Sequence, residues 1–309
     1  MIIDSHTHFY GPGLPEVHAK FVSGRLPTIG TDLDHEVDYF VNMMNKNGVD
    51  KNLAYCNPNE STAEMIEPHK DRFVPFASVD MKQGKKAAED LEYVVNSLGF
   101  KGIAEQTVAS KHFFIDDFEL LDPVYKKADD LGAIISWEMQ NHFLFGASRQ
   151  KFLGVERLQE VCFRYPNLKH LICHMGGFAN YRTTLSAFSG YKNVYMDISG
   201  MTTSAIWRHL TPVWGASAMA RYGSYVDPTR SKSGKPSDYE KVIAAATTDA
   251  IAAIREAANV IPDRIMFGTD GPFASRPELE LEVCRKALGH DKELLAHVLG
   301  ENARTFLNL

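Results

Sequence analysis

Two histidines near the N-terminus, His6 and His8, are separated by one residue and follow the apolar pair Ile2 and Ile3. Side chains alternate across a β-strand, so two residues with this spacing leave the strand on the same side. Two imidazoles on one face can bind a single divalent cation if later parts of the chain supply the other ligands. The pair therefore predicts a metal site at the end of the first strand, with two ordinary surface histidines as the alternative.

Two later segments each end an apolar run in a residue that could complete this site. HLICHMGG places His174 before two glycines, and RIMFGTDGPF places Asp270 before a Gly-Pro turn. Three imidazoles and one carboxylate form a common ligand set for a catalytic divalent ion that keeps a position open for water. An aspartate after a strand is also a common helix cap or turn residue, so one such segment alone is weak evidence. Together the segments predict that one metal ion is bound by His6, His8, His174 and Asp270, and that the aspartate also acts in catalysis.

These residues must be brought together by an alternation of strands and helices that runs through the chain. Eight short β-rich apolar runs are separated by segments with helical periodicity. Strands that alternate with helices indicate parallel pairing, and eight such units favour a single-domain (β/α)8 TIM barrel over residues 1–309, with an open, doubly wound sheet as the alternative. In a barrel, the carboxyl ends of all strands meet at one mouth, where the predicted ligands would lie. The predicted strands are Ile2–Ser5, Asn52–Cys56, Phe73–Val79, Phe100–Ala104, Ala133–Glu138, His170–His174, Val194–Ile198 and Arg264–Gly268.

Two long segments interrupt the alternation, at about residues 11–31 and 207–237. The first is rich in Gly and Pro, and the second contains several aromatic and basic residues. Both follow predicted strands, where a barrel builds its active site, and long loops commonly cover such a site. We expect the second segment to form a lid over the site or, as the alternative, a contact in a homodimer.

The composition is that of an ordinary globular enzyme and argues against several other classes of protein. The chain of 309 residues has a net charge of −6 and a pI of about 6.1, which argues against a nucleic-acid-binding surface. No apolar run approaches the ~20 residues that cross a bilayer, and no signal peptide precedes the first predicted strand. The four cysteines have no CxxC spacing and indicate reduced thiols. We expect a cytoplasmic protein that acts on a small-molecule substrate.

Several other polar residues lie where they could contact the metal or the substrate. Glu138 and Glu105 each follow or end a predicted strand and could be ligands or substrate contacts, although turn carboxylates are as common there. The planar fork of Arg182 could bind a substrate carboxylate, and an exposed helix arginine is the alternative. His170 precedes His174 by ~13 Å along a strand, so we expect it to be structural and near the other end of the barrel.

Six segments of the chain, taken in order, resemble one known family. IIDSHTH, GFKGIAEQ, HLICHMGG, NVYMDISG, IMFGTDGPF and GENARTFLNL together resemble the amidohydrolase superfamily, in particular the branch that includes aminocarboxymuconate-semialdehyde decarboxylase. The resemblance implies a (β/α)8 barrel with one divalent metal, zinc first and manganese as the alternative. It places the family's metal ligands on His6, His8, His174 and Asp270. Members hydrolyse small lactones and related bonds, hydrate dicarboxylates, or remove CO2 from aromatic and muconate acids.

Two departures from the decarboxylase pattern bear on the reaction. Decarboxylases of this type typically carry another histidine shortly after the strand that here reads VYMDIS, where this chain has Gly200, Met201 and Thr202. The stretch ISWEMQ resembles one that has His-Pro ahead of Trp-Asp-Met, but here the histidine is absent. Trp137 in this stretch is a candidate substrate contact, as is His209, which the second long segment could deliver.

The departures favour a metal-dependent hydrolase that acts on a small anionic or cyclic substrate, such as a lactone or an amide, through a metal-activated water. Asp270 would accept the proton of that water and deliver it to the leaving group. No strand end offers a lysine suited to carbamylation, so we expect a single metal ion. Nonoxidative decarboxylation of an aromatic or muconate-type acid at the same metal is the alternative reaction. A binding or scaffold protein with a structural metal is the alternative outside catalysis.

Overall fold

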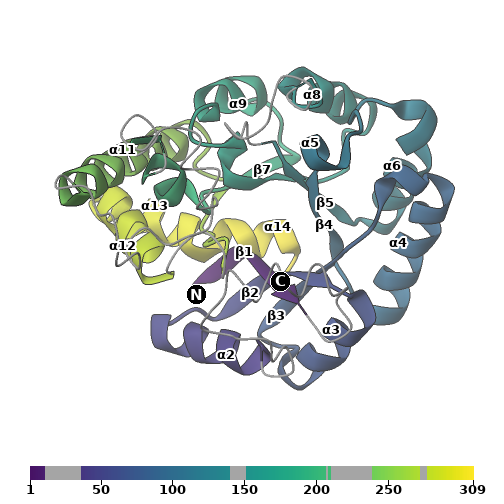
Figure 1. The fold of residues 1–309 in the computed structure, drawn as a ribbon, viewed down its shortest axis with the longest axis horizontal. Coiled ribbons are helices and arrows are strands. Elements are labelled where there is room, and N and C mark those ends of the chain that lie inside the picture. The colour runs from purple at the N-terminus through teal and green to yellow at the C-terminus, as the bar shows by residue number, and fades with distance from the viewer. Residues whose placement is uncertain (11–35, 140–150, 207, 210–238, 272–276) are drawn as a thin grey trace.

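The computed structural model describes residues 1–10, 36–139, 151–206, 208–209, 239–271 and 277–309. Eight strands form one parallel sheet in the order β1 to β8 (Figure 1). The long segment predicted at about 11–31 lies outside the described residues, as does nearly all of the one at about 207–237. The strands are β1 (Ile3–Tyr10), β2 (Lys51–Asn57), β3 (Phe73–Ala77), β4 (Gly102–Thr107), β5 (Ile134–Glu138), β6 (His170–Ile172), β7 (Val194–Asp197) and β8 (Ile265–Met266).

Backbone hydrogen bonds join the first strand to the chain around and after the last one, and this closes the sheet into a barrel. The amide of Ser5 donates to the carbonyl of Phe267 at 2.9 Å, and the amide of Asp270 donates to the carbonyl of His6, also at 2.9 Å. Closure removes the two exposed edges that an open sheet would have. The predicted (β/α)8 TIM barrel is therefore confirmed in place of the open, doubly wound sheet.

Helices form an outer ring around the strands, because each parallel strand must be reached by a crossover that returns the chain to the same end of the sheet (Figure 1). None of the helices in the described ranges is long and apolar enough to span a bilayer. The α-helices are α2 (Glu36–Asn47), α3 (Asn59–Ile66), α4 (Lys85–Leu98), α5 (Val108–Lys111), α6 (Phe118–Leu131), α8 (Val155–Arg164), α9 (Tyr181–Phe188), α11 (Tyr239–Val260), α12 (Pro277–Leu288), α13 (Lys292–Ala296) and α14 (Asn302–Leu307).

The strands pack between two apolar layers, one inside the barrel and one under the helices. Ile3 and Leu53 belong to the inner cluster, which also includes Phe306 of α14. The Phe306 ring lies 4.4 Å, centroid to centroid, from that of Tyr195 near the start of β7. Helix α14 therefore covers the end of the barrel where the strands begin, and the opposite end remains the mouth at which a site can form.

Strand β1 is longer than the sequence predicted, which moves the histidine pair into it. We expected the strand to end at Ser5, but it continues to Tyr10, with an irregular register between Asp4 and Thr7. His6 and His8 consequently lie within the strand rather than after it. The strand is longer because its second half pairs with β2 as far as Asn57.

Strands β4 and β5 approach each other closely at Gly102, three residues before Glu105. A Cβ atom at Gly102 would lie 2.1 Å from the carbonyl oxygen of Ile134. Gly102→Ala should force the strands apart and lower the free energy of unfolding by about 1–3 kcal/mol, the usual range for overpacking. Denaturant titration measures this change. Gly190→Ala is the control, since a Cβ there meets nothing within 4 Å, and equal stability of the two variants would contradict the prediction.

His170 at the start of β6 is fully buried in the layer between strands and helices. Its Nδ1 accepts a hydrogen bond of 3.1 Å from Nε1 of Trp137. Burial lowers the pKa of His170 to about 3, so the imidazole is neutral in the folded protein. This geometry fits the structural role that we expected for His170.

The neutral imidazole of His170 makes the stability of the protein depend on pH. The unfolded chain binds a proton at the ordinary histidine pKa of 6.5, whereas the folded chain does not until about pH 3, so stability is lost as the pH falls below 6.5. His170→Asn keeps an acceptor for Trp137 and removes this loss. Between about pH 7 and pH 5, we expect the wild type to lose about 2 kcal/mol more than the variant. Urea titrations at both pH values measure the difference, and parallel losses would contradict it.

Candidate metal centre

Three of the four predicted metal ligands converge on one point at the mouth of the barrel. The Nε2 atoms of His6 and His8 lie 3.2 Å apart. Oδ1 of Asp270 lies 3.1 Å from His8 Nε2 and 3.5 Å from His6 Nε2. Donor atoms bound at about 2.0–2.1 Å to a tetrahedral ion are about 3.3 Å from one another. The three atoms are therefore spaced as ligands of one divalent cation would be, and the residues fit such an ion.

His174 lies beside this group, because the chain leaves the sheet earlier than the sequence predicted. Strand β6 ends at Ile172, and His174 and Met175 have left-handed backbone angles, with φ of 56° and 52°. This turn brings the imidazole of His174 against that of His6, with ring centroids 4.7 Å apart. Asp270 has a similar φ of 58°, after β8 has ended at Met266 rather than at the predicted Gly268.

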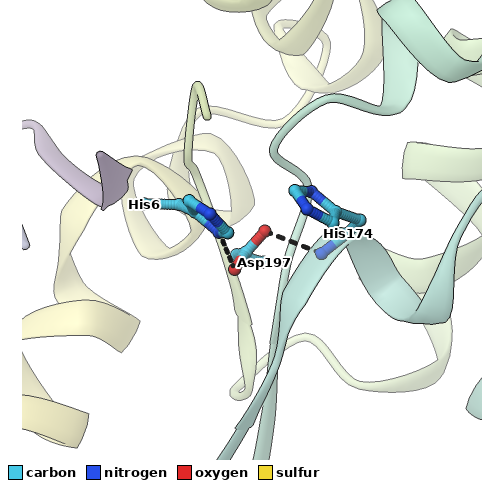
Figure 2. A group of neighbouring side chains, drawn as sticks. All are labelled: His6, His174 and Asp197. Carbon is cyan, nitrogen blue, oxygen red and sulfur yellow. Dashed lines mark hydrogen bonds and ion pairs between the residues drawn. The ribbon is translucent and has the colours of Figure 1, made fainter. Parts of the chain in front are cut away.

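A buried carboxylate, Asp197 at the end of β7, contacts the imidazole of His6 and the backbone amide of His174 (Figure 2). Its Oδ2 lies 3.1 Å from Nδ1 of His6, and its Oδ1 accepts a hydrogen bond of 3.0 Å from the amide of His174. Burial opposes the charge of Asp197, but the neighbouring His6 and His174 lower its pKa below the ordinary value. An ionised Asp197 holds the proton of His6 on Nδ1 and leaves Nε2 as the metal donor.

Ser199, two residues after the end of β7, fixes the imidazole of His174. Its carbonyl oxygen lies 2.9 Å from Nδ1 of His174, and its hydroxyl oxygen lies 2.8 Å from the same nitrogen. The hydroxyl also donates to the carboxylate of Asp197. His174 therefore donates from Nδ1 to Ser199 and presents Nε2 to the mouth of the barrel.

Two glutamates reach the same point from β4 and β5. Oε1 of Glu105 lies 3.5 Å from Nε2 of His174, and Oε2 of Glu138 lies 3.3 Å from it. Burial disfavours the imidazolium, but the charge of Glu138 and the polar contacts with Glu105 and Glu138 raise the pKa of His174 well above the ordinary value. A bound divalent cation would neutralise this negative charge around the imidazole nitrogens.

The structure brings together some of the predicted contact residues and separates others. Glu138 joins the cluster. Trp137 does not, because alternation along β5 turns it to the outer layer, where it is fully buried. Arg182 is exposed and binds the carboxylate of Glu256 at 3.0 Å, and Nε2 of His209 lies 2.8 Å from Oδ2 of Asp249. Both residues are thus engaged by α11, away from the cluster.

Asp197, like Ser199, lies beside the predicted ligands but was not singled out in the sequence analysis. Its signal was nevertheless present, since it ends an apolar strand as Glu138 does. Its role could not be predicted from this position alone, because a strand-end aspartate can orient histidines only when other strands place them beside it.

Comparison with known proteins identifies the family. The family model described as amidohydrolase matches residues 3–309. The chain belongs to the amidohydrolase family. No curated protein matches the sequence. Solved structures provide the remaining comparisons.

Solved structures similar to this chain include enzymes of two reaction types. A dihydroxybenzoic acid decarboxylase from Polaromonas sp. JS666, with bound manganese and 2-nitroresorcinol, is 18% identical with a TM-score of 0.65, covering 100% of this chain and 97% of that one. A 5-carboxyvanillate decarboxylase from Novosphingobium aromaticivorans, complexed with manganese, is 15% identical with a TM-score of 0.66, covering 100% and 96%. A probable 2-pyrone-4,6-dicarboxylic acid hydrolase from Acinetobacter baumannii is 12% identical with a TM-score of 0.63, covering 100% and 99%. At these identities the likeness shows the barrel fold.

The position of Asp197 predicts that it controls metal affinity without touching the ion. Asp197→Asn could donate toward Nδ1 of His6 and would favour the tautomer in which Nε2 carries the proton. We expect the affinity for zinc or manganese to fall about 10- to 100-fold, as for other residues that orient metal-bound histidines. Competition with a chelator measures the affinity.

Asp249→Asn is the matched control, because it alters a histidine–aspartate pair of 2.8 Å that lies outside the cluster. Its metal affinity should equal that of the wild type. Equal losses in both variants, or none in Asp197→Asn, would show that Asp197 does not orient His6.

Proposed function

We propose that the protein is a metal-dependent decarboxylase that removes CO2 nonoxidatively from an aromatic carboxylic acid bearing a hydroxyl group. The observation that carries the proposal is the convergence of His6, His8 and Asp270 at the distances that one divalent ion requires. Two similar structures that match along the whole chain are decarboxylases containing manganese. The sequence alone favoured hydrolysis, and these comparisons support its alternative better.

In this proposal His6, His8 and Asp270 would hold the ion, and His174 is the predicted fourth ligand. A bound divalent ion would act as a Lewis acid toward the oxygen atoms of the substrate. Zinc was the first expectation from the sequence, whereas the manganese in two similar structures favours that ion. A donor set that mixes imidazole and carboxylate suits either metal.

Asp270 is placed to move the proton that the reaction needs. Burial opposes its charge, but the adjacent His8, His174 and His6 lower its pKa below the ordinary value, so it can accept a proton. We propose that it takes the proton of the substrate hydroxyl and returns it to the ring carbon that bears the carboxylate. The bond between that carbon and the carboxylate breaks, its electron pair forms the new C–H bond, and CO2 leaves.

Hydrolysis is the second candidate, and the surroundings of Gly200 favour it. A Cβ atom at Gly200 would lie 3.3 Å from Nδ1 of His174 and 3.6 Å from Oδ2 of Asp270, so a larger side chain would crowd both residues. Residues 200–206, all described, contain no counterpart of the additional histidine that is typical of decarboxylases. In hydrolysis Asp270 would accept the proton of a water molecule instead.

Product analysis decides between the two reactions. The protein reconstituted with manganese or zinc is incubated with hydroxybenzoic acids and, separately, with lactones, and the products are measured by mass spectrometry. Release of CO2 from a hydroxybenzoic acid is the expected result. Ring opening of a lactone without CO2 release would establish the second candidate instead. Turnover of neither class would contradict both.

The Asp270→Asn variant tests the proton transfer. Asparagine keeps an oxygen atom at the position of Oδ1 but cannot carry the proton, so we expect kcat to fall about 10²- to 10⁴-fold and metal content to change little. Asp130→Asn, the same change on the exposed surface of α6, is the control. Normal turnover in Asp270→Asn would remove the aspartate from the mechanism.

A further inference from the structure

A small cavity lies between helix α2 and the outer side of strands β1 and β2, away from the mouth of the barrel. Its volume is about 30 Å³, and about 10–15 Å³ is enough to hold one particle the size of water. On the strand side it is lined by polar residues that include Asp4, Asn52 and Thr269. On the helix side it is lined by the aromatic and methionine side chains of Tyr39, Phe40, Met43 and Met44.

Asp4 and Asn52 face this cavity because of their places in neighbouring strands. The two residues are opposite each other in the register of β1 and β2. Ile3 and Leu53, which adjoin them in sequence, belong to the cluster inside the barrel, and side chains alternate across a strand. Asp4 and Asn52 are therefore turned outward, toward α2, and each is only 3% exposed.

The amide oxygen of Asn52 indicates that the cavity has an occupant. This Oδ1 is buried and accepts no hydrogen bond from any residue in the described part of the chain. A buried polar oxygen without a partner is unfavourable, and such atoms in folded proteins are paired with protein groups, water or ions. The occupant would therefore bring a proton or a positive charge to this oxygen.

The carboxylate of Asp4 brings negative charge to the same cavity. Its Oδ1 accepts hydrogen bonds from the amides of His6 and Thr269, at 3.2 and 2.9 Å, and its Oδ2 accepts one from the hydroxyl of Thr269 at 2.7 Å. Within the ranges that the structure describes, no lysine or arginine forms an ion pair with it. Buried charges in folded proteins are paired or bind a cation, so the charge of Asp4 favours a cation as the occupant.

We propose that this cavity binds a monovalent cation of the size of potassium or ammonium between the carboxylate of Asp4 and the amide oxygen of Asn52. One carboxylate balances one positive charge, whereas a divalent ion would leave excess charge among apolar side chains. Potassium and ammonium ions are about as large as a water molecule, so they fit a cavity of this volume. The site is separate from the mouth of the barrel and does not depend on which reaction takes place there.

A cation at this position would strengthen the closure of the barrel. Asp4 lies in the first strand and binds both the amide and the hydroxyl of Thr269, which follows the last strand. The ion would join Asn52 of β2 to this pair, so three segments of the chain would meet at one charge. We therefore expect the stability of the protein to depend on which monovalent cation is present.

Thermal unfolding in different chloride salts tests the site. The full-length protein is unfolded in equal concentrations of potassium, ammonium or choline chloride, with manganese in every sample to occupy donors at the mouth. Choline is too large for the cavity. We expect Tm to be about 2–4 °C higher in potassium or ammonium chloride than in choline chloride, and equal Tm in all three salts would overturn the proposal.

The Asn52→Leu variant assigns the effect to this cavity. Leucine has nearly the size of asparagine but no oxygen atom, so the difference in Tm between potassium and choline chloride should disappear. Asn96→Leu, the same change at an exposed position of α4, is the matched control and should keep the difference. An undiminished difference in folded Asn52→Leu would place the ion elsewhere and overturn the proposal.

A crystal of the wild type grown in rubidium chloride gives a readout that needs no variant. Rubidium replaces potassium in such sites and scatters anomalously. An anomalous peak between Asp4 and Asn52 is the expected result. A cavity that holds a water molecule without anomalous signal would overturn the proposal, and this measurement decides if Asn52→Leu does not fold.

Discussion

The metal centre depends on the seam at which the barrel closes. The amide of Asp270 donates to the carbonyl of His6 across this seam, so the last predicted ligand is tied directly to the first. At the neighbouring residue, Thr269, both the amide and the hydroxyl donate to the buried carboxylate of Asp4, at 2.9 and 2.7 Å. Ligands that come from opposite ends of the chain are thereby held at the spacing of a single ion, which neither segment could do alone.

A second layer of interactions decides which atoms of the imidazoles face the mouth. Asp197 and Ser199 bind the Nδ1 atoms of His6 and His174, so both rings are oriented before any ion binds. Such preorganisation strengthens metal binding because the side chains lose little further freedom when they coordinate. Ionised Asp197 also keeps negative charge beneath the site, which favours cations over other ligands at this end of the barrel.

Much of the fold could be predicted from the sequence, because alternation of strands and helices is a local pattern that survives in the barrel. The ligand candidates His6, His8 and Asp270 could be proposed for the same reason, since each follows a predicted apolar strand. The exact ends of the strands could not be predicted. β6 ends at Ile172 because His174 and Met175 adopt left-handed backbone conformations, whereas the apolar pattern in the sequence predicted a strand as far as His174.

The roles of Glu105, Glu138 and Asp197 could not be predicted for a different reason. All three lie at or within two residues of the end of a strand, where a turn carboxylate is equally common, and their partners come from other strands. The single metal ion stays a prediction from the sequence, where no strand end offers a lysine suited to carbamylation.

The left-handed backbone at His174, Met175 and Asp270 has a consequence for the evolution of this barrel. A residue with a Cβ atom in this conformation costs about 1–2 kcal/mol, and glycine would avoid most of it. The rest of the molecule must offset this cost, since the function needs an imidazole and a carboxylate there. Glycine would relieve this strain, but at Met175 it would remove a side chain from the hydrophobic core, and at His174 and Asp270 it would remove the donor atoms. Substitutions at these three positions are therefore constrained both by the backbone conformation and by the side chain that must be present.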